Sequence, residues 1–88
     1  MKEYKYIKLY EYFIKDNKPI IVLSIYEIEK ILKFKLCKSA YTHSIWWSDD
    51  NGRHTQSFAW IKANYQVYKV CIEYKYIVFI KNEIMELL

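Results

Sequence analysis

The sequence contains very little glycine, proline, arginine and cysteine, and each shortage excludes a class of protein. The single glycine, Gly52, cannot build the glycine-rich loop that cradles phosphates in nucleotide-binding enzymes. Scarce Gly and Pro, with 53% hydrophobic and 19% aromatic residues, exclude an intrinsically disordered chain. We therefore expect one small folded domain over residues 1–88, with no cofactor.

Long apolar stretches are also missing. The longest uncharged apolar run covers residues 19–26, far short of the roughly 20 residues that a membrane span needs. The first residues are charged where a signal peptide has its apolar region. The sequence therefore predicts a cytoplasmic protein with no membrane contact.

The two cysteines, Cys37 and Cys71, lie far apart in the chain. Without a signal peptide we expect them to be free, mostly buried thiols rather than a disulfide. Together with His43 and His54 they do not show the short ligand spacings of structural zinc sites. We therefore expect no metal.

The formal net charge is +4, and the whole basic excess lies in residues 1–48, because residues 49–88 hold equal numbers of basic and acidic side chains. A basic half permits contact with phosphates. The alternative is that the many Lys, Ile, Tyr and Asn residues reflect translation of an AT-rich genome.

The first part of the chain has clear periodicity. Apolar residues at helical spacing predict an amphipathic helix over residues 4–15, and a β-branched run predicts a strand over residues 20–23. Ser24 and Glu27 have the spacing of a capping box, which predicts a helix that continues to about Leu32. Ser39 is the expected cap of a third helix that runs through about Trp47.

The second part begins with a polar loop over residues 48–53 and a helix over residues 56–64, with Asn64 as a left-handed C-terminal residue. Residues 65–72 and 76–81 alternate and predict a β-hairpin, followed by a helical turn over 82–88. The expected fold is α+β, in the order helix, strand, helix, helix, loop, helix, hairpin. This order is close to that of a winged helix, except for the additional helix before the hairpin.

The chain also resembles a small bacterial domain family of unknown function. The pattern of that family contains L-Y-x-[YF], S-[FY]-x-E-I-E-x-I-L, L-P-x-S-A-x-x-H-x-x-W-W-[SA]-[ND] and Q-[AS]-x-A-W-x-x-A-G-[YW]-x-V. The matching residues here are Leu9, Tyr10, Tyr12, Ser24, Glu27, Ile28, Glu29, Ile31, Leu32, Leu36, Ser39, Ala40, His43, Trp46, Trp47, Ser48, Asp49, Gln56, Ser57, Ala59, Trp60, Ala63, Tyr65 and Val67. The departures are Lys33 and Asn64 in place of Gly, Cys37 in place of Pro, and Tyr41 in place of Arg. The resemblance implies a domain that occurs alone or with nucleases of bacterial defence systems, and it implies no particular activity.

Trp46 and Trp47 are adjacent, and adjacent helical residues point about 100° apart, so we expect one to pack and the other to lie at the rim. The rim Trp is a candidate for base stacking or an interface, and the alternative is that both are structural. The same choice is open for the tyrosines that cannot all be core, which are Tyr4, Tyr12, Tyr41, Tyr65, Tyr74 and Tyr76.

Two enzyme patterns are weak. His43, Asp49, Asp50, Asn51, Arg53 and His54 surround one loop, as in a metal-dependent nuclease, but the expected flanking helices do not supply the ββα frame. We expect a solvated loop with His43 partly buried. Glu73-Tyr74-Lys75 matches an E-x-K nuclease pattern, but it lies at the expected hairpin turn. We therefore expect no enzyme.

The favoured function is a non-enzymatic nucleic-acid-binding domain for DNA or RNA. Its contacts are expected from the third helix and hairpin, through Lys35, Lys38, Tyr41, Thr42, Trp46, Arg53, Lys69 and Lys75. The alternative is a mobile-element inhibitor, similar to anti-CRISPR proteins, that docks on a host defence nuclease complex through protein contacts. The sequence leaves monomer and homodimer open.

Overall fold

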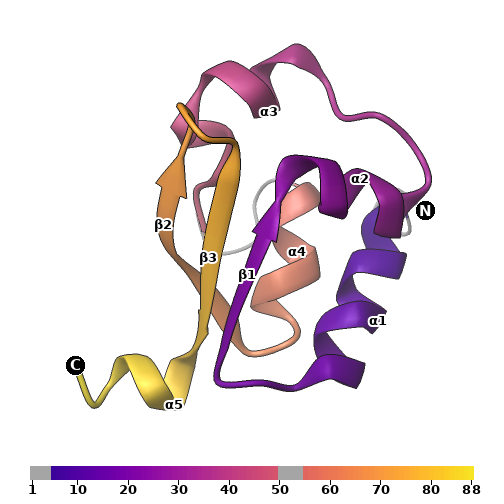
Figure 1. The fold of residues 1–88 in the computed structure, drawn as a ribbon. Helices are drawn as coiled ribbons and strands as arrows, with labels where there is room; N and C mark the ends of the chain where they lie inside the picture. Colours follow the sequence, from indigo (N-terminus) through magenta and orange to yellow (C-terminus); the bar gives the residue numbers. More distant parts are fainter. Residues whose placement is uncertain (1–4, 50–54) are drawn as a thin grey trace.

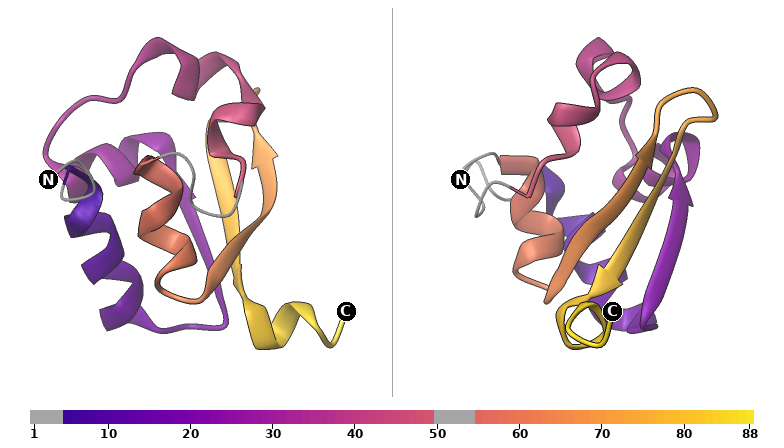
Figure 2. Two further views of the ribbon diagram at one scale, coloured as in Figure 1. Left: turned by 180° about the vertical axis from the view of Figure 1, so that it is seen from behind. Right: turned by 90° about the vertical axis from the view of Figure 1, so that its left-hand side faces the viewer.

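The computed structural model describes residues 5–49 and 55–88, and within these it has the predicted α+β fold (Figure 1). The elements follow the order α1 (Ile7–Asp16), β1 (Ile20–Ser24), α2 (Ile25–Leu32), α3 (Lys38–Thr42), the 3-10 helix η2 (Ser44–Trp47), α4 (Thr55–Ile61), β2 (Tyr65–Cys71), β3 (Tyr76–Lys81) and α5 (Asn82–Met85). Three antiparallel strands form one sheet, and helices α1 and α4 pack on one of its faces (Figure 2).

The sheet has the strand order β1-β3-β2, so the second hairpin strand is central and the other two are edges. Ile21 pairs with Phe79 and Leu23 pairs with Ile77, and all four side chains are buried. Between Val67 and Lys69 the register of β2 shifts at a bulge. These alternate residues of β1 and β3 therefore point to the buried face of the sheet, because successive side chains of a strand point to opposite faces.

The core is aromatic. Helices α1 and α4 lie on the same side of the sheet (Figure 2, right). From α1 the ring of Phe13 packs 4.7 Å from that of Phe79 and 5.0 Å from that of Tyr65, measured between centroids. From α4 the ring of Trp60 lies 5.3 Å from that of Phe79. One cluster of rings thus joins both helices to both strands of the hairpin.

The capping box at the start of α2 is confirmed. The Ser24 hydroxyl accepts from the backbone N–H of Glu27 at 2.9 Å, and the Glu27 carboxylate accepts from the N–H of Ser24 at 2.8 Å. Two backbone donors that have no partner inside the helix are satisfied in this way. The strand β1 can therefore pass directly into α2 without an intervening loop.

Lys33 and Asn64 follow helices and have positive φ, as does Asn17 at the end of α1. Lys33, at the C-terminus of α2, has φ 68°, and Asn64, after α4, has φ 73°. The left-handed conformation of Asn64 was predicted. These are the two positions at which the sequence departs from glycine in the pattern it resembles. The departure costs backbone strain, because only glycine adopts this conformation freely.

The predicted third helix, 39–47, is wrong in its extent. Helix α3 covers only Lys38–Thr42, and η2 follows after His43, which is extended at φ −126° and ψ 112°. The break leaves the carbonyl of Ala40 free to accept from the indole N–H of Trp47 at 2.9 Å. Since Trp47 is buried, its N–H needs a partner, and a continuous helix would have occupied that carbonyl.

Two further expectations need correction. The helix predicted over 56–64 ends at Ile61, and residues 62–64 form a turn that leads into β2. Both cysteines are free as predicted, but Cys37 is exposed and Cys71 is only half-buried. Cys37 precedes α3 in extended backbone next to the buried Leu36, so its side chain points the other way.

Candidate functional site

Helix α3 meets the hairpin turn at one end of the molecule (Figure 1). In all views α3 and the turn between β2 and β3 lie side by side (Figures 1 and 2). The Lys75 ammonium donates to the carbonyl of Tyr41 at 3.1 Å and to that of Ile72 at 2.9 Å. The bond between Lys75 and Tyr41 joins residues that are far apart in sequence. We use the name α3–hairpin end for Lys38, Tyr41 and Thr42 of α3, Lys75 of the hairpin turn and Lys35 of the segment that leads into α3.

The side chain of Tyr41 is held in place by a residue of α2. Its hydroxyl donates to the carboxylate of Glu29 in α2, and the same carboxylate oxygen accepts from the backbone N–H of Leu36 at 2.8 Å. Glu29 is buried, at 8% exposed. The hydrogen bond to Glu29, and secondarily burial, raises the pKa of Tyr41 from 10.0 to about 12. Tyr41 is thus a positioning residue that holds α3 against α2.

The lysines of the α3–hairpin end are exposed. The one ion pair among the described residues joins Lys18, on the loop after α1, to Asp16, the last residue of α1. Lys35, Lys38 and Lys75 are therefore not neutralised by carboxylates within the described chain. One acidic residue, Glu73, lies exposed in the same hairpin turn. The α3–hairpin end therefore carries more positive than negative charges.

Helix α3 ends at Thr42, and His43 follows it. The Thr42 hydroxyl donates to the carbonyl of Lys38 at 3.1 Å and lies 2.7 Å from Nδ1 of His43. His43 is exposed, so its predicted partial burial is wrong. The reason is again the helix break, because an extended residue between two short helices points its side chain outward while Trp47 turns in.

The double Trp divides as predicted into one core and one rim residue. Trp47 is 1% exposed and stacks near Trp60 with centroids 5.9 Å apart. Trp46 is half-buried and makes an edge contact with Tyr6 at 6.5 Å. The remaining surface of Trp46 borders a hollow of about 430 Å³ with Ser39, His43, Ile45 and Gln56. Only part of the Trp46 ring is therefore exposed for stacking against a base.

The other two predicted contact residues are not part of the α3–hairpin end. Lys69 lies on β2, opposite Val78, with its ammonium 5.9 Å from the ring centroid of Tyr76. It is exposed and flanks the hairpin. Arg53, like Asp50, Asn51 and His54 of the polar loop and Tyr4, lies outside the described residues.

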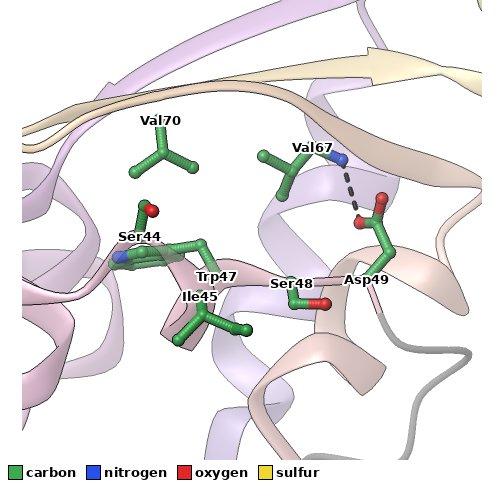
Figure 3. Close-up of a pocket in the computed structure, with 7 residues that line it drawn as sticks. All are labelled: Ser44, Ile45, Trp47, Ser48, Asp49, Val67 and Val70. Carbon is green, nitrogen blue, oxygen red and sulfur yellow. Dashed lines mark hydrogen bonds between the residues drawn. The ribbon is translucent and has the colours of Figure 1, made fainter.

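A second hollow, of about 540 Å³, was not found from the sequence. Figure 3 shows it between η2 and β2. It is lined by Ser44, Ile45, Trp47, Ser48, Asp49, Val67 and Val70. Ile45 borders both hollows and is 75% exposed, the largest exposure of a described apolar side chain away from the C-terminus. Ile45 directly precedes the double Trp, and no sequence pattern indicated that it would be exposed.

Asp49 has a structural task in this hollow. Its Oδ1 accepts from the indole N–H of Trp60 at 2.9 Å. It also accepts from the backbone N–H of Val67 at 3.0 Å, the bond drawn in Figure 3. Over residues 5–49 and 55–88, no three His, Cys, Asp or Glu side chains lie together as metal ligands would. The E-x-K segment lies in the hairpin turn, as the sequence indicated.

Comparison with known proteins adds one result. A family model, described as a domain of unknown function (DUF7662), matches residues 6–82. The chain belongs to this family. The matched region contains every helix and strand from α1 to β3 and the start of α5, so the family corresponds to the whole fold. No curated protein and no solved structure matches the chain. In the part of the chain that the structure describes, no helix has the length and apolarity of a membrane span.

Proposed function

We propose that this domain is a non-enzymatic nucleic-acid-binding module that contacts the phosphate backbone through its α3–hairpin end. The observation that carries the proposal is the Lys75–Tyr41 hydrogen bond. It holds the hairpin turn beside α3, so that lysines from two distant segments share one surface. Backbone phosphates are the general electrostatic target of such a surface.

The short helix limits what this surface does. Five residues of α-helix at about 1.5 Å each give less than two turns, too short to lie along a major groove and read several bases. The proposed contacts are therefore to phosphates and not to base edges. The domain binds DNA or RNA with little sequence preference.

In this proposal the hairpin serves as the wing of a winged helix does. The hairpin is stiffened by β1, which pairs with β3 from Ile20 to Ser24. Its turn stands next to α3 in the position of a wing that touches the backbone. Lys69, exposed on the same hairpin, is a further phosphate contact in this proposal.

The test compares two double variants in a binding assay with a labelled 20-base-pair DNA duplex and a single-stranded RNA. Lys35→Gln with Lys38→Gln removes two charges from the α3–hairpin end. Lys8→Gln with Lys15→Gln removes two exposed charges from α1. We expect the first pair to weaken binding at least tenfold at low salt and the second pair to change it little. Equal losses in both pairs would show that only net charge matters.

A second function, inhibition of a host defence nuclease complex, is favoured by one observation. Ile45 stands exposed between two hollows, a shape suited to a protein interface. A pull-down after nuclease treatment separates the two proposals. A partner that is retained by the native chain and lost with Ile45→Asp supports inhibition, whereas loss of all partners after nuclease treatment supports nucleic-acid binding.

A further inference from the structure

The strand β1 has an open edge. The hydrogen bonds from Lys81 N–H to the Pro19 carbonyl and from Ile25 N–H to the Lys75 carbonyl continue the ladder at its two ends. Because pairs alternate in an antiparallel ladder, Ile21 and Leu23 bond to β3, and the N–H and C=O groups of Ile20 and Val22 point away from it. No hydrogen bond among the described residues uses those four groups.

The opposite edge of the sheet is protected. Strand β2 carries a bulge between Val67 and Lys69, and Lys69 is exposed there. The backbone N–H of Val67 is already taken by the Asp49 carboxylate. Bulges, lysines and covered N–H groups are the usual means by which proteins prevent edge pairing. The segment Ile20–Ser24 has no charged residue and no register shift, so β1 lacks the protection that β2 has.

From this difference we infer that β1 pairs with β1 of a second copy of this chain. A two-fold axis at Ile21 places Ile20 opposite Val22 of the second copy, and the reverse. All four outward groups on each strand then find partners, and four new backbone hydrogen bonds form. A register centred on Val22 instead would place Ile20 opposite Ser24, whose N–H is already bonded to Glu27. The pairing at Ile21 is the register that uses every free group.

The surroundings of β1 agree with this occupant. The side chains of Ile20 and Val22 are 51% and 56% exposed, and in the paired sheet they cover each other across the interface. The same register sets Lys18 beside Ser24 and Glu27 of the second copy, so that an exposed ammonium approaches a carboxylate. Helix α1 lies on one face of the sheet (Figure 2, right), not in line with its strands. The inference does not depend on the nucleic-acid proposal.

The first experiment measures mass by sedimentation equilibrium over a concentration series. We expect the native chain to approach twice 10.9 kDa. Val22→Pro removes an outward N–H and leaves the bonds to β3 intact, so it should stay folded by circular dichroism and sediment as a monomer. Val22→Thr keeps the N–H and should remain a dimer. A native chain that stays at 10.9 kDa throughout overturns the inference.

The second experiment tests the register without a proline. In a background with Cys37→Ser and Cys71→Ser, one protein carries Ile20→Cys and another carries Val22→Cys. Directly opposed residues in a bonded pair have Cα atoms about 5.5 Å apart, within disulfide range. We expect mild oxidation to cross-link the mixture far more than either protein alone. A dimer whose mixture cross-links no better than the single proteins uses another surface and contradicts the inference.

Discussion

The hydroxyl of Tyr41 donates a hydrogen bond to the carboxylate of Glu29, twelve residues earlier in the chain, and so fixes α3 to α2. The carbonyl of the same Tyr41 accepts from the Lys75 ammonium. Three segments that are distant in sequence therefore meet at this one residue. In the pattern that the chain resembles, Arg is common at this position, and here Tyr gives a positional role in place of a charge.

Removal of the Tyr41 hydroxyl tests that role. In Tyr41→Phe the Glu29 carboxylate keeps only the backbone N–H of Leu36 as a described donor. We expect the free energy of unfolding to fall by about 1 to 2 kcal/mol, the usual cost of losing a partner of a charged group. Urea denaturation measures it. Tyr26→Phe, at an exposed position on α2, should change the free energy by less than about 0.5 kcal/mol. Equal values for the two variants would contradict the account.

The raised pKa of Tyr41 has a consequence at alkaline pH. A group whose pKa is higher in the folded protein stabilises the fold below its unfolded pKa, here 10.0. That stability is lost as pH rises through the folded pKa of about 12. We expect stability to fall between these values, and Tyr41→Phe to lose less over the same range. Burial also raises the pKa of Tyr65 and of Tyr6, so part of the loss persists in the variant. Parallel pH profiles for the native chain and the variant would contradict this.

Glycine at position 33 should stabilise the protein. Lys33→Gly relieves a positive φ of 68°, and we expect a gain of roughly 0.5 to 1 kcal/mol in the free energy of unfolding. Lys30→Gly, within α2, is the matched control and should lose about 1 kcal/mol. Asn64→Gly should gain less than Lys33→Gly. Asn tolerates this conformation, and its side chain bonds to Glu83 and Asn82. Thermal unfolding of the three variants decides the order.

The assignment of Asp49 as structural also has a direct check. Asp49→Ala leaves the indole N–H of Trp60 and the N–H of Val67 without their shared acceptor. We expect a loss of about 1 to 3 kcal/mol in the free energy of unfolding. Asp49→Asn keeps an oxygen acceptor and should lose clearly less. A stable Asp49→Ala variant would mean that the carboxylate serves something other than the fold.

Local signals in the sequence predicted most of the elements. The capping box of Ser24 and Glu27, the left-handed Asn64 and the two strands of the hairpin are all indicated by a few adjacent residues, and each was confirmed. The expected alternation is absent from the burial pattern of β2, whose register shifts at a bulge. The division of the double Trp followed from helical geometry alone. The third helix failed because its break at His43 depends on a buried indole that needs the Ala40 carbonyl, which is a tertiary requirement.

The candidate site was only partly predictable for the same reason. The sequence named Lys35, Lys38 and Lys75 as basic, but it contained no sign that Lys75 bonds to Tyr41. Tyr65 was among the tyrosines left open. It proves to be 1% exposed, with its hydroxyl donating to the Lys18 carbonyl at 2.6 Å. Residues that make such contacts have no fixed spacing in the sequence, so no local pattern predicts the contact.

The central claim is that lysines of the α3–hairpin end contact phosphates, and the salt dependence of binding tests it most directly. The binding constant for a labelled DNA duplex is measured between 50 and 200 mM salt. Each neutralised phosphate contributes a slope of roughly −0.9 in log binding constant against log salt. With Lys35, Lys38, Lys69 and Lys75 engaged we expect a slope of about −3 to −4, which becomes shallower by about 2 in the variant with Lys35→Gln and Lys38→Gln. Binding that does not change with salt, or a slope that the variant leaves intact, would contradict the claim.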